Sequence, residues 1–294
     1  MLTRNEGYNY QMVKENNLEG GFVVKKDNIC STRYPFLLIH GTGSIDPIHW
    51  GRIPSALEQH GAVVFFGQQD SWADIETNAA GIAVRIDEIL TQTHAEKVNI
   101  IGHSKGGLEA RMVASSLGMQ DKIASITTVA TPHYGSKTID GLARLPHFFW
   151  RRIAASVNRQ AAAAGDKHPD CFKVCNGFTT EYMQEFNENN PNQAGILYQS
   201  YACILRFPFS SIILFLTKLV VYYIEGQNDG FVTTSSASWG NRHSIIYSNS
   251  LRGISHQDAV DIKKKPLTTK GGSGVSDICD VYVQIAKELK IEGL

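Results

Sequence analysis

The stretch KVNIIGHSKGGLEARMVASSLG, residues 97–118, decides the fold of this chain. It joins an apolar, β-branched run to a glycine-rich turn and then to a segment whose apolar residues recur at helical spacing. The turn is Gly102-His103-Ser104-Lys105-Gly106, in which a serine has a glycine two residues away on each side. A strand, a sharp turn and a helix in this order predict that Ser104 is held in a strained conformation as an exposed nucleophile.

The rest of the chain repeats the alternation of strand and helix. Apolar, β-rich runs other than the one before Ser104 occur at 36–40, 62–66, 123–130, 195–202 and 243–247. Segments with helical spacing separate several of them, and a last amphipathic segment covers 275–290. Nearly continuous apolar strands that alternate with helices predict an α/β fold, with a mostly parallel central sheet covered by helices on both faces. A length of 294 residues is compatible with one such domain.

Composition excludes several classes of protein. Lys and Arg total 28 and Asp and Glu total 28, so no overall basic charge favours nucleic acid as a partner. The five cysteines contain no Cys-x-x-Cys pair, which argues against a thiolate metal site. The most apolar segment, 207–217, is shorter than the roughly 20 residues that span a bilayer, so we expect no transmembrane segment. Residues 1–17 lack the apolar run of a signal peptide, which favours a cytoplasmic location, with secretion as the alternative.

A second motif lies at the end of the first strand. His40-Gly41-Thr42-Gly43 follows the run FLLI directly. A serine nucleophile of this kind needs two backbone N–H donors for the oxyanion, one from the residue after the serine and one from the loop after an earlier strand. We therefore expect the N–H groups of Thr42 and Lys105 to form the oxyanion hole. The alternative is that this glycine-rich loop is an ordinary turn.

The acid and the base must follow Ser104 in the order serine, acid, histidine. Asp229 stands in GQNDGFV, where Asn-Asp-Gly predicts a tight turn that presents a carboxylate. Only His243 and His256 follow it, and His243 begins the presumed last strand, whereas His256 lies in the loop beyond that strand. We therefore predict Asp229 as the acid and His256 as the base. Glu225 is the rival acid, although its place before Gly226 is typical of the end of a strand or helix.

The stretch between residues 132 and 191 has no strand signal, which predicts a helical lid or cap insertion at about 135–190. Within it, residues 139–160 read as one amphipathic helix interrupted by Pro146. Its apolar face contains Leu142, Leu145, Phe148, Phe149, Ile153 and Val157, and Arg144, Arg151, Arg152 and Arg159 lie largely off that face. Such a helix is predicted to close over an apolar pocket in water and to open at a lipid–water interface. The alternative is an ordinary helix packed permanently on the core.

Several motifs together resemble the bacterial triacylglycerol lipases of the Pseudomonas and Burkholderia type. The resemblance runs from about residue 36 to residue 261. It is carried by FLLIHGTG, HWGRIPSALEQHGAVVFF, KVNIIGHSKGG, ITTVATPHYGS, FNENNPNQAGILYQSYA, NDGFV and ISHQDAV. It implies the α/β-hydrolase fold and hydrolysis of acylglycerol esters at a transiently contacted lipid–water interface. It also implies the same site residues: Ser104 as nucleophile, Asp229 as acid, His256 as base, and Thr42 and Lys105 as oxyanion donors.

The sequence departs from this family at the structural calcium site. Asp258 matches one of the family's calcium ligands, but no acidic residue occurs between Tyr201 and Tyr223, where the other would stand. Because calcium prefers several oxygen ligands, we expect no bound metal and no cofactor. Two other functions fit the same motifs: a carboxylesterase for short, soluble esters, and a non-catalytic binding protein with this fold.

Overall fold

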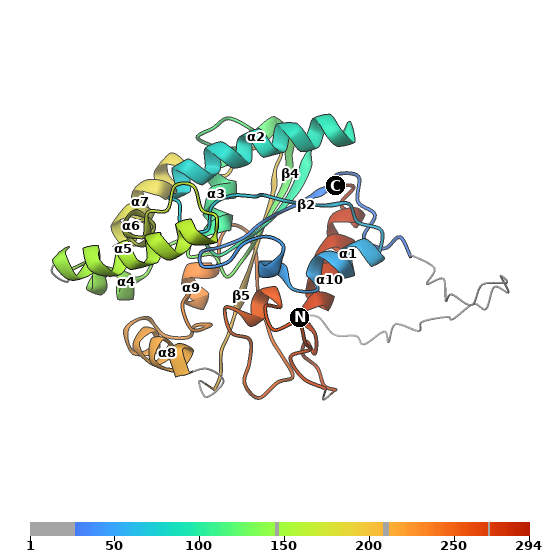
Figure 1. Ribbon diagram of the computed structural model, residues 1–294. Coiled ribbons are helices and arrows are strands. Elements are labelled where there is room, and N and C mark those ends of the chain that lie inside the picture. The colour runs from blue at the N-terminus through green and yellow to red at the C-terminus, as the bar shows by residue number, and fades with distance from the viewer. Residues whose placement is uncertain (1–26, 145–146, 208–211, 270) are drawn as a thin grey trace.

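A parallel six-stranded sheet forms the centre of the protein (Figure 1). The computed structural model describes residues 27–144, 147–207, 212–269 and 271–294. The strands are β1 (Phe36–Ile39), β2 (Val64–Phe66), β3 (Val98–His103), β4 (Ile123–Val129), β5 (Leu197–Cys203) and β6 (Arg242–Ile246). Their order in the sheet is β2-β1-β3-β4-β5-β6, and every neighbouring pair is parallel. The predicted parallel α/β architecture is confirmed.

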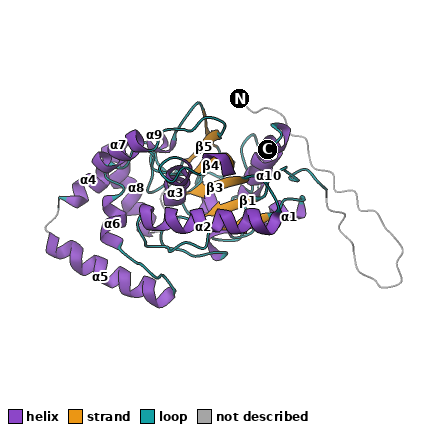
Figure 2. Cartoon of the chain, turned by 90° about the horizontal axis from the view of Figure 1, so that it is seen from above, coloured by secondary structure: helices purple, strands orange, loops and turns teal. Residues whose placement is uncertain are grey.

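Helices cover both faces of the sheet, as Figure 2 shows from above. The helices α1 (Ile53–Gln59) and α10 (Ile278–Ile291) pack on one face, and α2 (Ile75–Thr93) and α3 (Lys105–Ala114) pack on the other. Successive residues of a strand point to opposite faces. Leu38 and Ile101 accordingly belong to the core under α1 and α10, whereas Leu37 and Ile100 belong to the core under α2 and α3.

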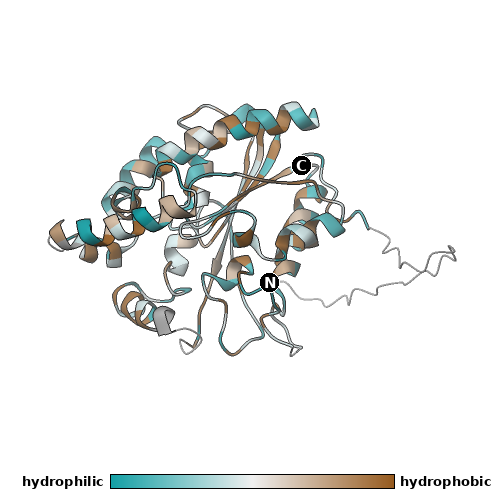
Figure 3. Ribbon diagram, viewed as in Figure 1, coloured by the Kyte–Doolittle hydropathy of each residue, from teal (hydrophilic) through white to brown (hydrophobic). Residues whose placement is uncertain are grey.

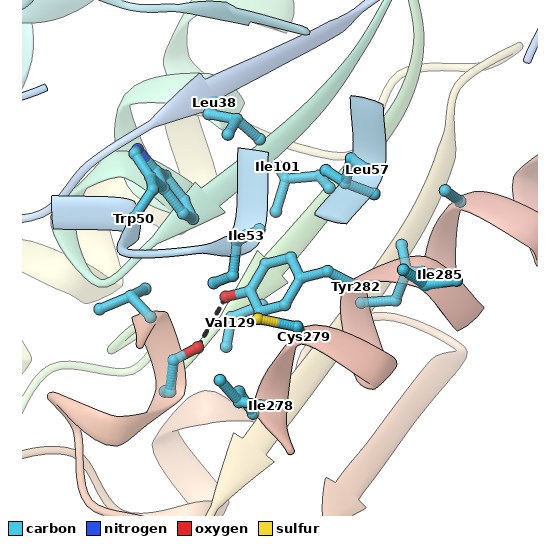
Figure 4. Close-up of a cluster of buried hydrophobic side chains, with 14 of the residues drawn as sticks. Leu38, Trp50, Ile53, Leu57, Ile101, Val129, Ile278, Cys279, Tyr282 and Ile285 are labelled. Atoms are coloured by element: carbon cyan, nitrogen blue, oxygen red, sulfur yellow. Dashed lines mark hydrogen bonds between the residues drawn. The ribbon is translucent and has the colours of Figure 1, made fainter. Parts of the chain in front are cut away.

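The core under α1 and α10 also holds the loop that carries His256 (Figure 4). Tyr282 of α10 is fully buried, and its ring packs edge-on against Trp50 with a centroid distance of 6.2 Å. The Tyr282 hydroxyl donates a 2.8 Å hydrogen bond to the carbonyl oxygen of Ala259. The last helix is thereby tied to the loop that carries His256.

Between β4 and β5 the described residues form four helices: α4 (Lys137–Ala143), α5 (His147–Ala164), α6 (Cys171–Asn176) and α7 (Thr180–Asn189). The amphipathic stretch over 139–160, which the sequence shows interrupted by Pro146, is divided between α4 and α5. Proline disfavours helical backbone at the residue before it, which is why the sequence predicts an interruption at Pro146. Residues 145–146 and the side chain of Phe149 lie outside the described residues. The lid itself stays a prediction.

The apolar segment that starts at residue 207 leads into α8 (Ile212–Glu225), with residues 208–211 outside the described ones. A short helix, α9 (Thr234–Ala237), follows before β6. None of the helices in the described parts of the chain is both long enough and apolar enough to cross a membrane.

Candidate active site

Ser104 lies in the sharp turn between β3 and α3. Its backbone has φ 53° and ψ −124°, a conformation in the left-handed region that a residue with a side chain rarely adopts. Backbone strain of this kind costs about 1–3 kcal/mol and persists only where the surroundings enforce it. The enforcement comes from both sides, because β3 is buried along its whole length and α3 packs on the sheet.

Two glycines allow the chain to approach Ser104 closely. A Cβ atom on Gly106 would lie 2.2 Å from the carbonyl oxygen of Ile39, so only glycine permits α3 to begin against the end of β1. A Cβ atom on Gly41 would lie 2.8 Å from the Cβ atom of Ser104. The loop that follows β1 therefore touches the serine directly.

The predicted oxyanion donors belong to these two segments. Lys105 is the first residue of α3, where backbone N–H groups have no partner inside the helix. Thr42 follows Gly41 in the loop that touches Ser104, and the N–H of Gly43 is fixed by a 2.7 Å bond to the Ser71 hydroxyl. The N-terminus of α3 and the loop after β1 thus meet at the serine, which is the arrangement that an oxyanion hole requires.

Asp229 and His256 are in direct contact. Nδ1 of His256 lies 2.7 Å from Oδ2 of Asp229, and the carboxylate is almost completely buried. The other carboxylate oxygen accepts hydrogen bonds from the backbone N–H groups of Phe231 and Val232, at 3.0 and 2.9 Å. The backbone N–H of His256 donates to the carbonyl oxygen of Asp229 at 2.9 Å. An acid held in this way fixes both the orientation and the tautomer of the imidazole.

The structure does not bring the rival residues to this place. His243 is exposed at the start of β6, the amino end of a parallel strand, whereas Ser104 follows the carboxyl end of β3. Glu225 ends α8 and accepts hydrogen bonds from the Ser136 hydroxyl and from the backbone N–H and hydroxyl of Thr138. It caps α4 and does not orient a histidine.

Two rings pack against His256 and a third packs against one of them, and no pattern in the sequence indicates this cluster. His103 lies 4.6 Å from His256 between ring centroids, and Phe231 packs edge-on at 5.5 Å. Nδ1 of His103 lies 3.1 Å from Nε2 of His49, whose ring is also buried. Burial lowers the pKa of His103 and of His49 well below the ordinary value, and neighbouring imidazoles lower both further. Burial and the neighbouring imidazoles thus favour the neutral form of both rings beside His256.

Comparison with known proteins agrees with this geometry. The sequence profile of the alpha/beta hydrolase fold matches residues 34–169. Triacylglycerol lipase 2 of Saccharomyces cerevisiae is 28% identical over 266 residues, which cover 86% of this chain and 76% of the yeast protein. The triacylglycerol lipase of Burkholderia plantarii is 32% identical over 58% of this chain. The chain is a lipase- or esterase-like α/β hydrolase.

The coverage of these relatives differs. The match to the Burkholderia protein spans 51% of that protein, and the match to the triacylglycerol lipase of Pseudomonas fragi spans 60% of its length. Among solved structures, the mature Bacillus licheniformis lipase BlEst2 has a TM-score of 0.59 at 20% identity, covering 79% of this chain and 87% of that one. The metagenomic carboxyl esterase MGS0156 has a TM-score of 0.65 at 14% identity, covering 89% and 77%. These structural likenesses show the fold.

Asp258 does not have the surroundings of a calcium ligand in this hydrolase. Its carboxylate forms a 2.8 Å ion pair with Nζ of Lys263 and accepts a 2.6 Å hydrogen bond from the hydroxyl of Ser255. Nη2 of Arg252 lies 3.6 Å from Oδ2 of Asp258. Burial alone would raise the pKa of the Asp258 carboxyl, but the bonds from Lys263 and Ser255 hold that pKa below its ordinary value. In the described part of the chain, no three His, Cys, Asp or Glu side chains gather as metal ligands. The ammonium group of Lys263 thus pairs with the carboxylate that a calcium ion would need as a ligand.

We therefore expect chelation to leave the protein unchanged. Treatment with EGTA should change neither the melting temperature nor the rate of ester hydrolysis, because Lys263 already neutralises Asp258. Differential scanning calorimetry with EGTA and with added calcium measures this directly. A fall of several degrees in melting temperature on chelation, reversed by calcium, would show that the protein binds calcium and would contradict this expectation.

A buried ion pair joins two residues of α3, the helix that follows Ser104. Nζ of Lys105 is 2.9 Å from Oε1 of Glu109, and both side chains are at most 1% exposed. Lys105 also donates to the carbonyl oxygen of Ala73, and Glu109 accepts a 2.7 Å bond from the amide of Asn78. The Lys105 side chain thus points into the protein interior. It takes no part in the oxyanion hole, for which we predict only the backbone N–H of Lys105.

Proposed function

We propose that this protein is a serine hydrolase that cleaves the carboxylic esters of acylglycerols through an acyl-enzyme, as a triacylglycerol lipase does. The observation that carries the proposal is the 2.7 Å contact between Asp229 and His256, whose ring lies 4.6 Å between centroids from that of His103, the residue before the strained Ser104. A carboxylate, an imidazole and a serine in such an elbow are the parts that acyl transfer requires.

The mechanism has two steps. His256 takes the proton of the Ser104 hydroxyl while the serine oxygen attacks the ester carbonyl, and the negative charge on the carbonyl oxygen is stabilised by the N–H groups of Thr42 and Lys105. His256, with its positive charge balanced by Asp229, then donates the proton to the departing alcohol. Water activated by His256 attacks the acyl-enzyme in the same way and releases the fatty acid. In other hydrolases, removal of one oxyanion donor lowers kcat by about 10²–10³-fold.

The acylglycerol substrate is supported by the relatives, several of which are named triacylglycerol lipases. A carboxylesterase acting on short, soluble esters would use the same residues with a smaller acyl pocket. The two are separated by a series of p-nitrophenyl esters of increasing chain length together with emulsified triolein. We expect hydrolysis of triolein and of long-chain esters. Activity confined to acetate and butyrate esters would favour the esterase.

The catalytic proposal has its own test, independent of substrate length. A fluorophosphonate probe should label the wild-type protein covalently at Ser104 and should not label the Ser104→Ala variant. Absence of labelling in a folded wild-type protein would favour the non-catalytic binding protein, since such a probe needs an activated serine.

The predicted lid has a distinct kinetic signature. Phe148 and Ile153 of α5 are 59% and 56% exposed, and α5 contributes only Ala154 and Ala161 to the buried side chains that the structure describes. We expect Phe148→Ser with Ile153→Ser to lower hydrolysis of emulsified triolein about tenfold and to leave hydrolysis of dissolved p-nitrophenyl butyrate nearly unchanged. A large fall in melting temperature, or equal losses on both substrates, would favour a permanently packed helix.

A further inference from the structure

Three helices form one surface at the carboxyl edge of the sheet. The helices α4 and α5 follow β4, and α8 follows β5, so all three leave the same edge of a parallel sheet (Figure 1). The end of α8 is bonded to the start of α4 through Glu225 and Thr138. We call the exposed side of α4, α5 and α8 the three-helix face.

The three-helix face exposes large apolar side chains. Figure 3 shows apolar residues distributed along these helices, in particular along α8. The exposed ones include Leu142, Phe148, Ile153, Leu216, Val220 and Tyr223, of which Tyr223 is 83% exposed. Exposed apolar side chains that cluster on one surface, unlike isolated ones, mark a site of protein or membrane contact.

The same helices carry a strong positive charge, although the chain as a whole is neutral. Their basic residues, counting the C-cap of α4, are Lys137, Arg144, Arg151, Arg152, Arg159 and Lys218, and all except Lys218 are exposed. Their two acidic residues, Asp140 and Glu225, are both used internally, because each accepts hydrogen bonds from the start of another helix. The ion pairs between described residues include none from Arg151 or Arg152. The positive charge of the face is therefore available to a partner.

We infer that the three-helix face docks on the anionic phospholipid surface of a membrane. Exposed apolar side chains enter the boundary between headgroups and acyl chains, while Lys and Arg beside them attract anionic headgroups. A second copy of this chain is disfavoured as the occupant, because it would bring the same positive charge. The inference deepens the proposed function and rests on it, since it names the surface from which the ester substrate would reach Ser104.

The experiment uses the full chain with Ser104→Ala, so that no lipid is hydrolysed. Co-sedimentation is measured with vesicles of phosphatidylcholine alone and with vesicles in which one quarter of the lipid is phosphatidylglycerol. We expect strong binding only to the second kind, with release at about 1 M NaCl, where the Debye length falls to about 3 Å. Equal binding to both kinds of vesicle, or binding to neither, would overturn the inference.

A charge-matched pair of variants tests the location of the contact. Each basic side chain near an anionic surface contributes about a fivefold factor in binding, so Arg151→Gln with Arg152→Gln should weaken it roughly 25-fold. The control is Arg33→Gln with Arg242→Gln, which removes the same charge from exposed arginines at the opposite, amino edge of the sheet. Equal weakening by both pairs would show that only net charge matters and would overturn the assignment to the three-helix face.

The apolar part of the contact is tested by fluorescence. In the same inactive background, Tyr223→Trp should shift its emission to the blue on vesicles that contain phosphatidylglycerol, whereas Ile291→Trp on α10, also highly exposed, should not shift. Equal shifts at both positions, or none at either, would contradict docking through α8. Hydrolysis of dissolved p-nitrophenyl butyrate by the wild-type protein is measured separately. If the wild-type protein does not hydrolyse this ester but the inactive variant still binds vesicles, the proposed function is wrong while the assignment of the membrane contact to the three-helix face is retained.

Discussion

Replacement of Ser104 or His256 with alanine should lower ester hydrolysis by about 10⁴-fold or more, with the fold intact. In the proposed mechanism the serine supplies the attacking oxygen and the imidazole moves its proton, so loss of either should remove the same step. Asp229→Ala should cost about 10³–10⁴-fold, because the imidazole would lose the 2.7 Å contact that orients it. The rate of p-nitrophenyl butyrate hydrolysis measures all three variants, and circular dichroism checks their folding.

The matched control for the base is His243→Ala, which should retain nearly full activity. His243 is exposed at the amino end of β6, and its contact is to the carbonyl oxygen of Gly240. The corresponding control for the acid is Glu225→Gln, which should weaken the cap of α4 and leave p-nitrophenyl butyrate hydrolysis within a few-fold of the wild-type rate. An inactive His243→Ala together with an active His256→Ala would refute the assignment of the base.

The second large effect is on stability. Lys105→Met should lower the free energy of unfolding by about 3–5 kcal/mol, because it leaves the fully buried carboxylate of Glu109 without its cation. For a protein of this size such a loss corresponds to a fall of about 10 °C in melting temperature. Residual activity measured well below that temperature should persist, since the backbone N–H of residue 105 is unchanged.

The double variant Lys105→Met with Glu109→Leu separates an unpaired charge from lost packing. It should recover much of the stability, since replacing a buried ion pair by apolar side chains of similar volume is often neutral. Urea unfolding of the wild type, of Lys105→Met, of Glu109→Leu and of the double variant gives the coupling free energy between the two side chains. If the double variant is as unstable as the sum of the single ones, the ion pair contributes little and the cost lies in packing.

The sheet could be predicted from the sequence because its signals are local. The runs that form β1, β3 and β4 are buried on both faces, so they are largely apolar and stand out from the amphipathic helices between them. The turn at Ser104 was equally accessible, since the glycines, the strand and the helix are adjacent in the chain. Chain order further identified Asp229 and His256 as candidates, and the structure brings them into contact. The catalytic roles themselves stay predictions.

The features of the site that the sequence did not predict depend mostly on contacts between distant segments, which no local pattern encodes. His49 and His103 are 54 residues apart, and only the packing of the loop after β1 against β3 brings their rings together. The bounds of α4 and α5 could not be read from the sequence, because the helical spacing of the apolar residues continues on both sides of Pro146. The pairing of Asp258 with Lys263 was missed for another reason: the lysines at 263–265 look like any solvated run.

The bond between Tyr282 and the carbonyl oxygen of Ala259 has a consequence for the order of events during protein synthesis. The turn at Ser104 and the loop that touches it are complete once β4 has left the ribosome, whereas the loop of His256 is anchored by α10, which is made much later. At about 5–20 residues per second, several seconds of translation separate the two. A nascent chain in that interval would contain Ser104 without a positioned His256, so under the proposed mechanism we expect no ester hydrolysis before α10 has packed on the sheet.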